Sequence, residues 1–339
     1  MPDRRIPTGR PSSPLPLRVR PRRLRRTPAL REWVAETDVE VRRLVYPIFV
    51  RPGTGRPRPI PSMPGIVQYT IGDLADLGRA LQQEGIRAVL LFGVAAKKFP
   101  DGREAWARDG VIPAAVRALK RAAPELVVTT DVCLCAYTSH GHCGVVRNHE
   151  VANDATCDLL GRVAVAHAEA GADVVAPSAM MDGQVARIRS ALDDEGHEAT
   201  ALWAYATKHA SAFYGPFREV EQSTPSFGDR RGYQMDPRNG REALRELVLD
   251  ELEGADLLMV KPALTGLDLL ARARFRVSIP LAAFQVSGEY AMLKWAAERG
   301  VFDEAAAVRE TLIALRRAGA DLIVTYFARD VARGAGTPR

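Results

Sequence analysis

Short apolar runs alternate with amphipathic stretches along the chain from Val41 onward. The runs are rich in Val, Leu, Ile and Ala, and their length is typical of strands buried on both faces of a sheet. They predict eight strands, over Arg43–Val50, Ala88–Val94, Leu126–Cys133, Asp173–Pro177, Ala199–Thr207, Asp256–Lys261, Pro280–Ser287 and Asp321–Phe327.

The stretches between the runs place apolar residues at helical spacing. They predict helices over Asp73–Glu84, Pro113–Ala122, Asn153–Ala170, Gln184–Asp194, Arg241–Leu252, Leu267–Phe275 and Ala305–Ala318. A Gly-Ala-Asp sequence leads from a helix into a strand three times, and glycine commonly ends helices. Eight strands separated by helices over roughly 290 residues predict an α/β fold, a closed (β/α)8 TIM barrel. An open doubly wound sheet is the alternative, but no Gly-x-Gly-x-x-Gly turn follows the first strand.

The barrel predicts where function lies, because active sites on this fold occupy the C-terminal ends of the strands. Six successive predicted strands end in polar or ionisable side chains, which is more than solvation requires. These residues are Asp131, Cys133, Ser178, Lys208, Lys261, Ser287 and Tyr326.

Lys261 closes one apolar run and precedes Pro262. An ammonium group at the rim of an apolar core is poorly solvated, and desolvation lowers the pKa of a lysine. A second lysine at the same rim, Lys208, would lower it further. The neutral amine can form a Schiff base with a carbonyl substrate. The alternative is a lysine at a strand end that extends its amine to water.

The connection His209–Gly240 is long and rich in Gly, Pro, Ser and Arg. Loops of this length inside a compact domain are usually functional or disordered. Arg218, Arg230 and Arg231 could clamp a carboxylate, since a guanidinium group offers two parallel donors. Alternatively, these arginines keep a flexible lid solvated.

Three of the four cysteines, Cys133, Cys135 and Cys143, lie within one short segment. Such clustering indicates a metal or catalytic site more than a disulfide. Three thiolates with no clear fourth ligand predict zinc with one open coordination position. Ligation by His140 or His142 would instead close the site and make it structural.

The net charge of +6 is concentrated in the first 26 residues, which hold nine arginines and one aspartate, so the rest of the chain carries −2. Residues 1–30 are also rich in proline and cannot form a core. We expect an extended arm that orders on a neighbouring subunit, followed by a catalytic barrel domain over residues 31–339. Two alternatives are less favoured. A nucleic-acid tail is not supported by interleaved aromatic residues. A transit peptide requires an amphipathic helix, which the prolines disrupt.

The apolar runs are all shorter than a membrane span, and none near Met1 resembles the core of a signal peptide. We therefore expect a cytoplasmic protein that binds neither membrane nor nucleic acid.

Specific motifs accompany the residues above. They are Pro61–Gly65, Asp131–Gly144, Val175–Ser178, Met180–Gly183, Ala212–Arg218, Phe227–Arg231, Met259–Pro262 and Val286–Glu289. In this order the motifs resemble the porphobilinogen synthase family, also called 5-aminolevulinate dehydratase, from about Arg22 to Phe327. The resemblance implies a lyase of tetrapyrrole (haem) biosynthesis that condenses two molecules of 5-aminolevulinate to porphobilinogen with loss of two waters.

The resemblance also implies roles for individual residues. Lys261 would form the Schiff base with Lys208 as its partner. Zinc would be held by Cys133, Cys135 and Cys143. Substrate contacts would come from Asp131, Ser178, Tyr214, Arg218, Arg230, Gln234, Ser287 and Tyr326. The family further implies a homo-octamer whose N-terminal arms wrap neighbouring subunits, and an additional allosteric magnesium at Glu246.

Three positions depart from the usual pattern of the family. Ala179 replaces a carboxylate beside Ser178, Gly266 replaces an aromatic residue, and Phe284 replaces a tyrosine. The lost carboxylate puts local acid–base roles in doubt, although both lysines and all three clustered cysteines are retained. The alternative function is another Schiff-base lyase of the aldolase type on the same barrel, which would not need the cysteines.

Overall fold

The computed structural model describes residues 19–334 and divides the chain into two compact units, Met1–Asp38 and Val39–Arg339. The described part of the first unit contains a 3-10 helix, η1 (Pro21–Arg25), and a short α-helix, α1 (Pro28–Trp33), and it buries no side chain. Thr27 caps α1 by accepting a hydrogen bond from the Leu30 N–H at 3.2 Å. The predicted arm therefore forms two short helices where extended chain was expected, and its residues 1–18 lie outside the described residues.

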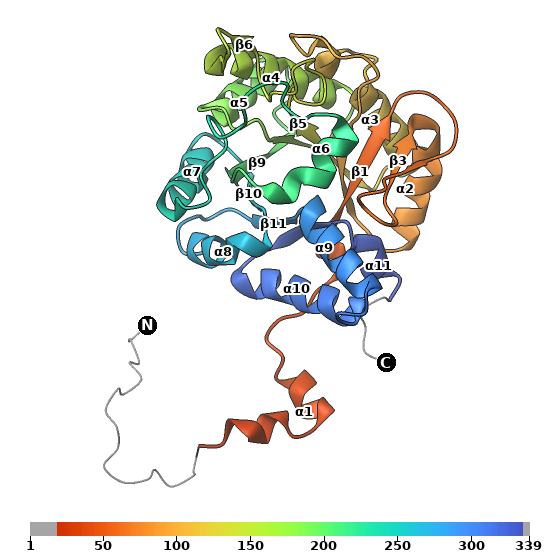
Figure 1. Cartoon of the computed structure of the whole chain (residues 1–339), viewed down its shortest axis with the longest axis vertical. Helices are drawn as coiled ribbons and strands as arrows, with labels where there is room; N and C mark the ends of the chain where they lie inside the picture. Colours follow the sequence, from red (N-terminus) through yellow and green to blue (C-terminus); the bar gives the residue numbers. More distant parts are fainter. Residues whose placement is uncertain (1–18, 335–339) are drawn as a thin grey trace. The chain divides into compact units, whose positions relative to one another are not determined.

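The second unit is a closed barrel of eight parallel strands within residues 39–334 (Figure 1). Around the barrel they are β1 (Leu44–Arg51), β4 (Ala88–Gly93), β5 (Val127–Val132), β8 (Val174–Pro177), β9 (Ala201–Lys208), β10 (Leu257–Lys261), β11 (Leu281–Gln285) and β12 (Leu322–Thr325). β12 pairs with β1, with Ile323 opposite Leu44, and this pairing closes the ring. All eight predicted strands are confirmed, and the open-sheet alternative is wrong.

Helices surround the strands in Figure 1. The periodicity predicts seven of them: α2 (Leu74–Gln83), α3 (Val111–Ala122), α4 (Asn153–Glu169), α5 (Gln184–Asp194), α7 (Gly240–Leu252), α8 (Leu267–Ala273) and α10 (Glu304–Ala318). It misses α6 (Gly215–Glu221), α9 (Ser287–Glu298) and α11 (Ala328–Ala332). Within residues 19–334, no helix combines the length and the apolar composition that crossing a bilayer requires.

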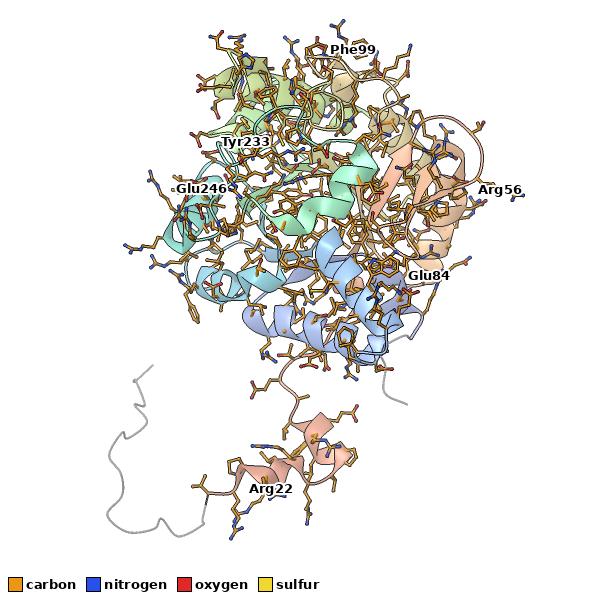
Figure 2. The ribbon with its side chains drawn as sticks, in the orientation of Figure 1. Arg22, Arg56, Glu84, Phe99, Tyr233 and Glu246 are labelled. Atoms are coloured by element: carbon orange, nitrogen blue, oxygen red, sulfur yellow. The ribbon has the colours of Figure 1, made fainter. Side chains whose placement is uncertain are left out.

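Smaller elements decorate the barrel. β3 (Val67–Thr70) pairs with β1 beyond the closed ring and with β2 (Arg58–Pro59), while β6 (Val146–Arg147) and β7 (Glu150–Val151) form a hairpin after β5. Five 3-10 turns complete the described part of this unit: η2 (Val41–Arg43), η3 (Ile71–Asp73), η4 (Arg103–Trp106), η5 (Ala212–Tyr214) and η6 (Leu264–Gly266). Glu84, labelled in Figure 2, accepts hydrogen bonds from Arg329 and Arg333 at 2.7 Å each and so ties α11 to the end of α2.

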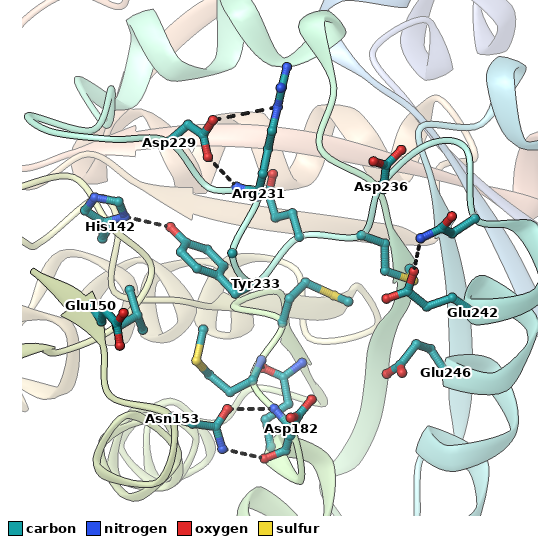
Figure 3. A pocket seen from close by; sticks show the side chains of 18 of the residues that line it. His142, Glu150, Asn153, Asp182, Asp229, Arg231, Tyr233, Asp236, Glu242 and Glu246 are labelled. Atoms are coloured by element: carbon teal, nitrogen blue, oxygen red, sulfur yellow. Dashed lines mark hydrogen bonds and ion pairs between the residues drawn. The ribbon is translucent and has the colours of Figure 1, made fainter.

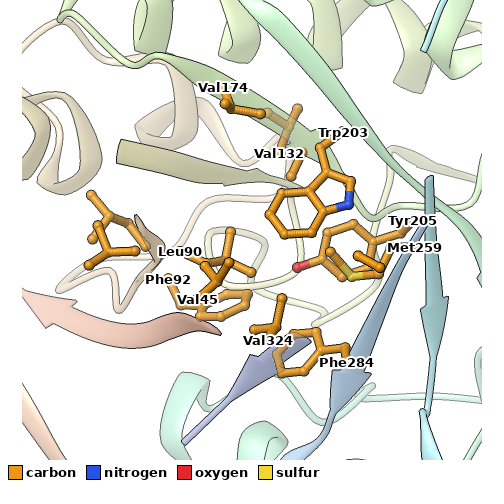
Figure 4. Close-up of a cluster of buried hydrophobic side chains, with 14 of the residues drawn as sticks. Val45, Leu90, Phe92, Val132, Val174, Trp203, Tyr205, Met259, Phe284 and Val324 are labelled. Atoms are coloured by element: carbon orange, nitrogen blue, oxygen red, sulfur yellow. The ribbon is translucent and has the colours of Figure 1, made fainter. Parts of the chain in front are cut away.

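Branched aliphatic and aromatic side chains from successive strands fill the barrel interior (Figure 4). Phe49, Phe92, Tyr205 and Phe284 are each no more than 1% exposed. The ring centroids of Phe92 and Phe284 lie 6.2 Å apart, and those of Phe49 and Phe92 lie 5.7 Å apart. These rings give the C-terminal ends of the strands an apolar, close-packed base.

The three Gly-Ala-Asp sequences link neighbouring strands at their N-terminal ends. In each, the aspartate carboxylate accepts a hydrogen bond from a backbone N–H of the adjacent strand, and the aspartate N–H donates to the carbonyl of that same residue. The pairs are Asp173 with Val128, Asp256 with Leu202, and Asp321 with Leu281, at distances between 2.6 and 3.0 Å. We call these three residues the floor aspartates; their repetition in the sequence reflects one repeated link between strands.

Candidate active site

We call the region at the C-terminal ends of the strands the barrel mouth. A small cavity lies there. Eight of the ten residues that line it are predicted site residues: Asp131, Cys135, Ser178, Lys208, Tyr214, Arg218, Arg230 and Lys261. Phe92 and Phe217 complete the lining. The expectation that function lies at this end of the barrel therefore agrees with where these side chains meet.

Lys261 ends β10 and is 5% exposed, so the alternative of an amine extended to water is wrong. Its Nζ lies 4.2 Å from the ring centroid of Phe284, 4.9 Å from that of Tyr205 and 5.1 Å from that of Phe217. Burial among these rings, and secondly the charge of Lys208, lower the pKa of Lys261 to about 7. A substantial fraction of this amine is therefore neutral near physiological pH.

Lys208 ends β9 directly opposite Lys261, and its ammonium donates a hydrogen bond to the carbonyl of Ser178. Asp131 on β5 faces both lysines, and its Oδ1 is buried without a hydrogen-bond partner in the described residues. Desolvation raises the pKa of Asp131 to about 6, although the two lysines oppose the shift. The barrel mouth thus holds an amine and a carboxyl group that both titrate near neutrality.

The three clustered cysteines form the metal candidate. The sulfur atoms of Cys133, Cys135 and Cys143 all lie within 4.8 Å of one another, and all three residues are buried. The Cys133 and Cys135 sulfurs are 3.4 Å apart, close to the roughly 3.8 Å edge of a tetrahedral zinc site with 2.3 Å bonds. Hydrogen bonds from the Cys133 and Cys135 thiols lower the pKa of Cys143 well below its usual range. The donor set and its spacing fit a metal ion.

Neither nearby histidine completes this cluster. The ring nitrogens of His142 lie 3.1 Å from the Tyr233 hydroxyl and 3.0 Å from the Phe227 carbonyl, and His140 contacts the Pro100 carbonyl at 3.1 Å. No ring nitrogen of His140 or His142 therefore joins the three sulfurs in the described cluster, and an open coordination position stays a prediction.

Helix α6 covers the barrel mouth (Figure 1). The Phe217 ring packs edge-on against Phe92, with centroids 4.9 Å apart, and against Phe49 at 5.5 Å. The cavity beneath has a volume of about 10 Å³, close to the ~10–15 Å³ that a single water needs. The closed barrel mouth therefore has no room for a ligand larger than a water.

Besides Cys133, Cys143 and Glu246, four predicted residues lie outside the lining of this cavity. Gln234 is buried in the neighbouring pocket, and neither atom of its amide has a partner in the described residues. Ser287 begins α9, where its Oγ accepts a hydrogen bond from the Phe217 N–H at 3.1 Å. Tyr326 follows β12 with a buried hydroxyl that lacks a described partner. Arg231 has an 82% exposed side chain beside Asp229.

A larger pocket of about 730 Å³ adjoins the mouth and is lined by many carboxylates (Figure 3). Glu246, the predicted magnesium residue, lies in it on α7, together with Asp182, Glu242 and Asp250. Burial, and secondly the charge of Glu253, raise the pKa of Asp250 to about 8. Burial, followed by the charge of Asp182, raises the pKa of Glu246. This pocket therefore carries excess negative charge that a cation would relieve.

Sequence reasoning missed Glu221, the last residue of α6. It is 2% exposed, and its Oε2 lies 3.6 Å from the Cys135 sulfur. Burial and the charge of Cys135 raise its pKa well above the usual range. Its spacing of three from Arg218 could have indicated a shared helix face pointing into the barrel.

The structure gives a physical reason for one departure from the family pattern, Gly266, and shows what a second, Phe284, contacts. A Cβ atom at Gly266 would lie 2.8 Å from Cγ1 of Val260, so a side chain there would force Val260 on β10 to shift. Phe284 contributes the ring nearest to the Lys261 amine, and without a hydroxyl it keeps that contact apolar.

A closed (β/α)8 barrel with buried lysines and a thiol cluster at the C-terminal ends of its strands has the architecture of a barrel enzyme. A sequence model of the delta-aminolevulinic acid dehydratase family matches residues 18–334. The chain belongs to the delta-aminolevulinic acid dehydratase family. This confirms the resemblance drawn from the motifs, and with it the prediction of a lyase.

Relatives of this name align over almost their whole length. The Synechocystis sp. protein is 49% identical over 319 residues, covering 93% of this chain and 98% of that protein. The Escherichia coli protein is 50% identical over 313 residues, covering 92% and 96%. A solved structure of delta-aminolevulinic acid dehydratase (porphobilinogen synthase) from Toxoplasma gondii, in complex with the reaction product porphobilinogen, superposes with a TM-score of 0.92 at 45% identity. That comparison covers 94% of this chain and 92% of that chain.

Proposed function

We propose that this chain is a porphobilinogen synthase that condenses two molecules of 5-aminolevulinate to porphobilinogen with loss of two waters, in tetrapyrrole biosynthesis. The observation that supports it most is the cavity in which the buried Lys261 amine and Cys135 of the thiol cluster face one another. Two identical substrate molecules need two different binding sites if they are to react in different poses. Membership of the delta-aminolevulinic acid dehydratase family argues against the aldolase-type alternative, which would also leave the thiol cluster without a role.

We assign Schiff-base formation to Lys261. Its neutral amine attacks the keto carbon of one 5-aminolevulinate, a carbon–nitrogen double bond forms, and the carbonyl oxygen leaves as water. Asp131, with a pKa near 6, is placed to give up and take back the protons of this step. The rings of Phe284, Tyr205 and Phe217 exclude the bulk water that would hydrolyse the imine.

Buried polar groups without partners indicate where the substrate carboxylates bind. Such groups are costly unless a ligand satisfies them. Arg218 Nε, Arg230 Nε and both atoms of the Gln234 amide are of this kind, and we assign them to the carboxylate of one substrate. We assign Ser287 and the Tyr326 hydroxyl to the carboxylate of the substrate on Lys261.

Two further residues shape the backbone of the site. The Tyr214 hydroxyl donates to the carbonyl of His209 at 2.8 Å and to that of Lys261 at 3.3 Å, which holds the end of β10 in place. Ser178 accepts the hydrogen bond of Lys208 through its carbonyl, and we assign its side chain, on the cavity lining beside Asp131, to substrate.

We assign zinc to Cys133, Cys135 and Cys143, because thiolates favour zinc over the hard cations magnesium and calcium. When bound, the ion would hold and polarise the amine or carbonyl group of the second substrate. After the hydrogen bonds of the other two thiols, the charges of Arg230 and Lys208 lower the pKa of Cys143 and favour its thiolate.

We also propose that the carboxylate pocket around Glu246 binds an allosteric magnesium, since hard oxygen ligands suit this ion. The residues that would serve it are Glu246, Asp182 and Asp250. A magnesium-dependent increase in activity that Glu246→Gln abolishes would support this assignment, and equal activation of that variant would contradict it.

We further propose a cytoplasmic homo-octamer with the arm at residues 1–30 forming subunit contacts. The described part of the arm buries no side chain of its own, as expected for a segment that is covered by another subunit. Deleting residues 1–26 should lower the mass in analytical ultracentrifugation, whereas an unchanged mass would contradict the proposal.

The reaction itself is tested by incubating the purified protein with 5-aminolevulinate and assaying for the pyrrole product, with zinc and with a chelator. We expect product with zinc and a loss of at least about 100-fold after chelation. Failure to form any pyrrole in either condition would overturn the proposed function.

A further inference from the structure

Helix α6 brings a carboxylate to the thiol cluster. Glu221 closes this helix, is 2% exposed, and points its Oε2 at the Cys135 sulfur from 3.6 Å. Glutamate is almost never fully buried unless it is paired or coordinates a metal. Among the described residues, the hydrogen-bond contact of this carboxylate is with a metal-ligand candidate, the Cys135 sulfur.

The geometry fits one edge of a coordination tetrahedron. With zinc bonds of about 2.3 Å to sulfur and about 2.0 Å to oxygen, a sulfur and an oxygen ligand lie about 3.5 Å apart. The separation of Glu221 Oε2 from the Cys135 sulfur, 3.6 Å, matches this value. Among the described residues, the ligand atoms that lie within 4.8 Å of one another are the three sulfurs, so Glu221 would have to turn its carboxylate towards Cys133 and Cys143 to join them.

The backbone around Glu221 is anchored from outside the helix. The Lys98 ammonium donates hydrogen bonds to the carbonyls of Glu221 at 2.8 Å and Gln222 at 2.7 Å, at the negative end of the helix dipole. The Arg230 guanidinium donates to the next carbonyl, that of Ser223, at 2.5 Å. The end of α6 is thereby fixed beside the cysteines.

We propose that Glu221 is the fourth protein ligand of the metal in the substrate-free enzyme. This proposal rests on the proposed metal site of Cys133, Cys135 and Cys143. Three thiolates and this carboxylate would fill a tetrahedral site without water and would hold a zinc ion more tightly than the thiolates alone. The fold gives this task to α6, the same helix that covers the cavity.

Zinc affinity tests the proposal on the full-length protein. Metal-free protein is titrated with zinc in competition with a chromophoric chelator, comparing wild type with Glu221→Gln. The control is Glu219→Gln, an exposed glutamate two positions earlier on the same helix. Glu221→Gln should weaken zinc binding by at least about 10-fold, Glu219→Gln should leave it unchanged, and Glu221→Asp should recover part of the loss.

Infrared difference spectra between zinc-loaded and metal-free protein separate a ligand from a mere neighbour. Wild type and Glu219→Gln should show a shift of a carboxylate stretching band, and Glu221→Gln should lack it. Zinc affinity of Glu221→Gln within threefold of wild type, or no carboxylate shift in wild type, would overturn the proposal. If wild type binds no zinc at all, the cysteine site itself fails; normal zinc binding by Glu221→Gln refutes only the role of Glu221.

Discussion

The two ends of the barrel treat charge in opposite ways. At the N-terminal ends of the strands, the floor aspartates are at least partly exposed, and each carboxylate accepts a hydrogen bond from a backbone N–H. At the barrel mouth, Lys261 and Glu221 are almost fully buried, and one oxygen of Asp131 has no described partner. The floor aspartates use their charge to hold neighbouring strands together. At the barrel mouth, ionisable groups are shielded from water, and this burial makes them reactive.

The difference is visible in the pKa values. Burial lowers the pKa of Lys261 to about 7 and raises that of Asp131 to about 6. A base and an acid whose pKa values both move towards neutrality can exchange protons at physiological pH. Such groups make the folded state less stable, and the apolar core and the strand links at the floor offset that cost.

Replacing Lys261 by methionine should break the mouth's chemistry most completely. Because the reactive amine is lost, we expect product formation to fall by at least about 10³-fold. The same change removes a desolvated ammonium, so the free energy of unfolding should rise by roughly 1–4 kcal/mol. A pyrrole assay and chemical denaturation measure the two effects, and retained activity would contradict the assignment.

The stability gain should itself depend on pH. The pKa of Lys261 is lower in the folded than in the unfolded chain, so the unfolded chain binds more protons between about pH 7 and the ordinary lysine pKa. The stability of wild type therefore rises with pH across this window. The advantage of Lys261→Met over wild type should shrink from pH 7 to pH 10, and a pH-independent difference would refute the lowered pKa.

Replacing Cys135 by alanine should disable one half-site and spare the other. We expect zinc binding to be lost and product formation to fall by at least about 100-fold, because the second substrate is no longer held. Cys157→Ala is the matched control, since Cys157 is a buried cysteine on α4 outside the cluster. Full activity of Cys135→Ala would instead favour an aldolase-type enzyme.

At the floor, Asp256→Ala should have the smallest effect and the opposite character. It removes one charged acceptor from the Leu202 N–H, which should cost about 1 kcal/mol of stability without changing activity per folded molecule. Asp256→Asn, which keeps an acceptor, should cost less. Chemical denaturation combined with the pyrrole assay measures both variants. A loss of activity in the folded variant would contradict the claim that the floor aspartates act on stability alone.

The sequence predicted the barrel and most of the mouth for a clear reason. Buried parallel strands are read from continuous apolar runs, and the barrel rule then brings their C-terminal residues together, as it does for Asp131, Lys208 and Lys261. The predicted end of the seventh strand was less accurate. Ser287 starts α9 because Glu289 accepts a hydrogen bond from the Val286 N–H at 2.7 Å and so caps a helix there.

What the sequence could not give lies on short elements and long-range contacts. Helix α6 has only seven residues, so the spacing of Arg218 and Glu221 is the only periodic signal, and it does not reveal the contact of Glu221 with Cys135. The Gly-Ala-Asp repeat was visible, but its role depends on a partner residue tens of positions earlier in the chain. The roles of Glu221 and of the Gly-Ala-Asp repeat depend on contacts with residues distant in the sequence, which only the folded structure shows.

The most direct test of the account is to trap the imine. Protein incubated with 5-aminolevulinate and borohydride is digested, and the modified residue is located by mass spectrometry at a series of pH values. We predict a reduced adduct on Lys261, with a trapping rate that rises half-maximally near pH 7. An adduct on Lys208, or no adduct at any pH, would contradict the claim that the barrel mouth keeps the Lys261 amine neutral for catalysis.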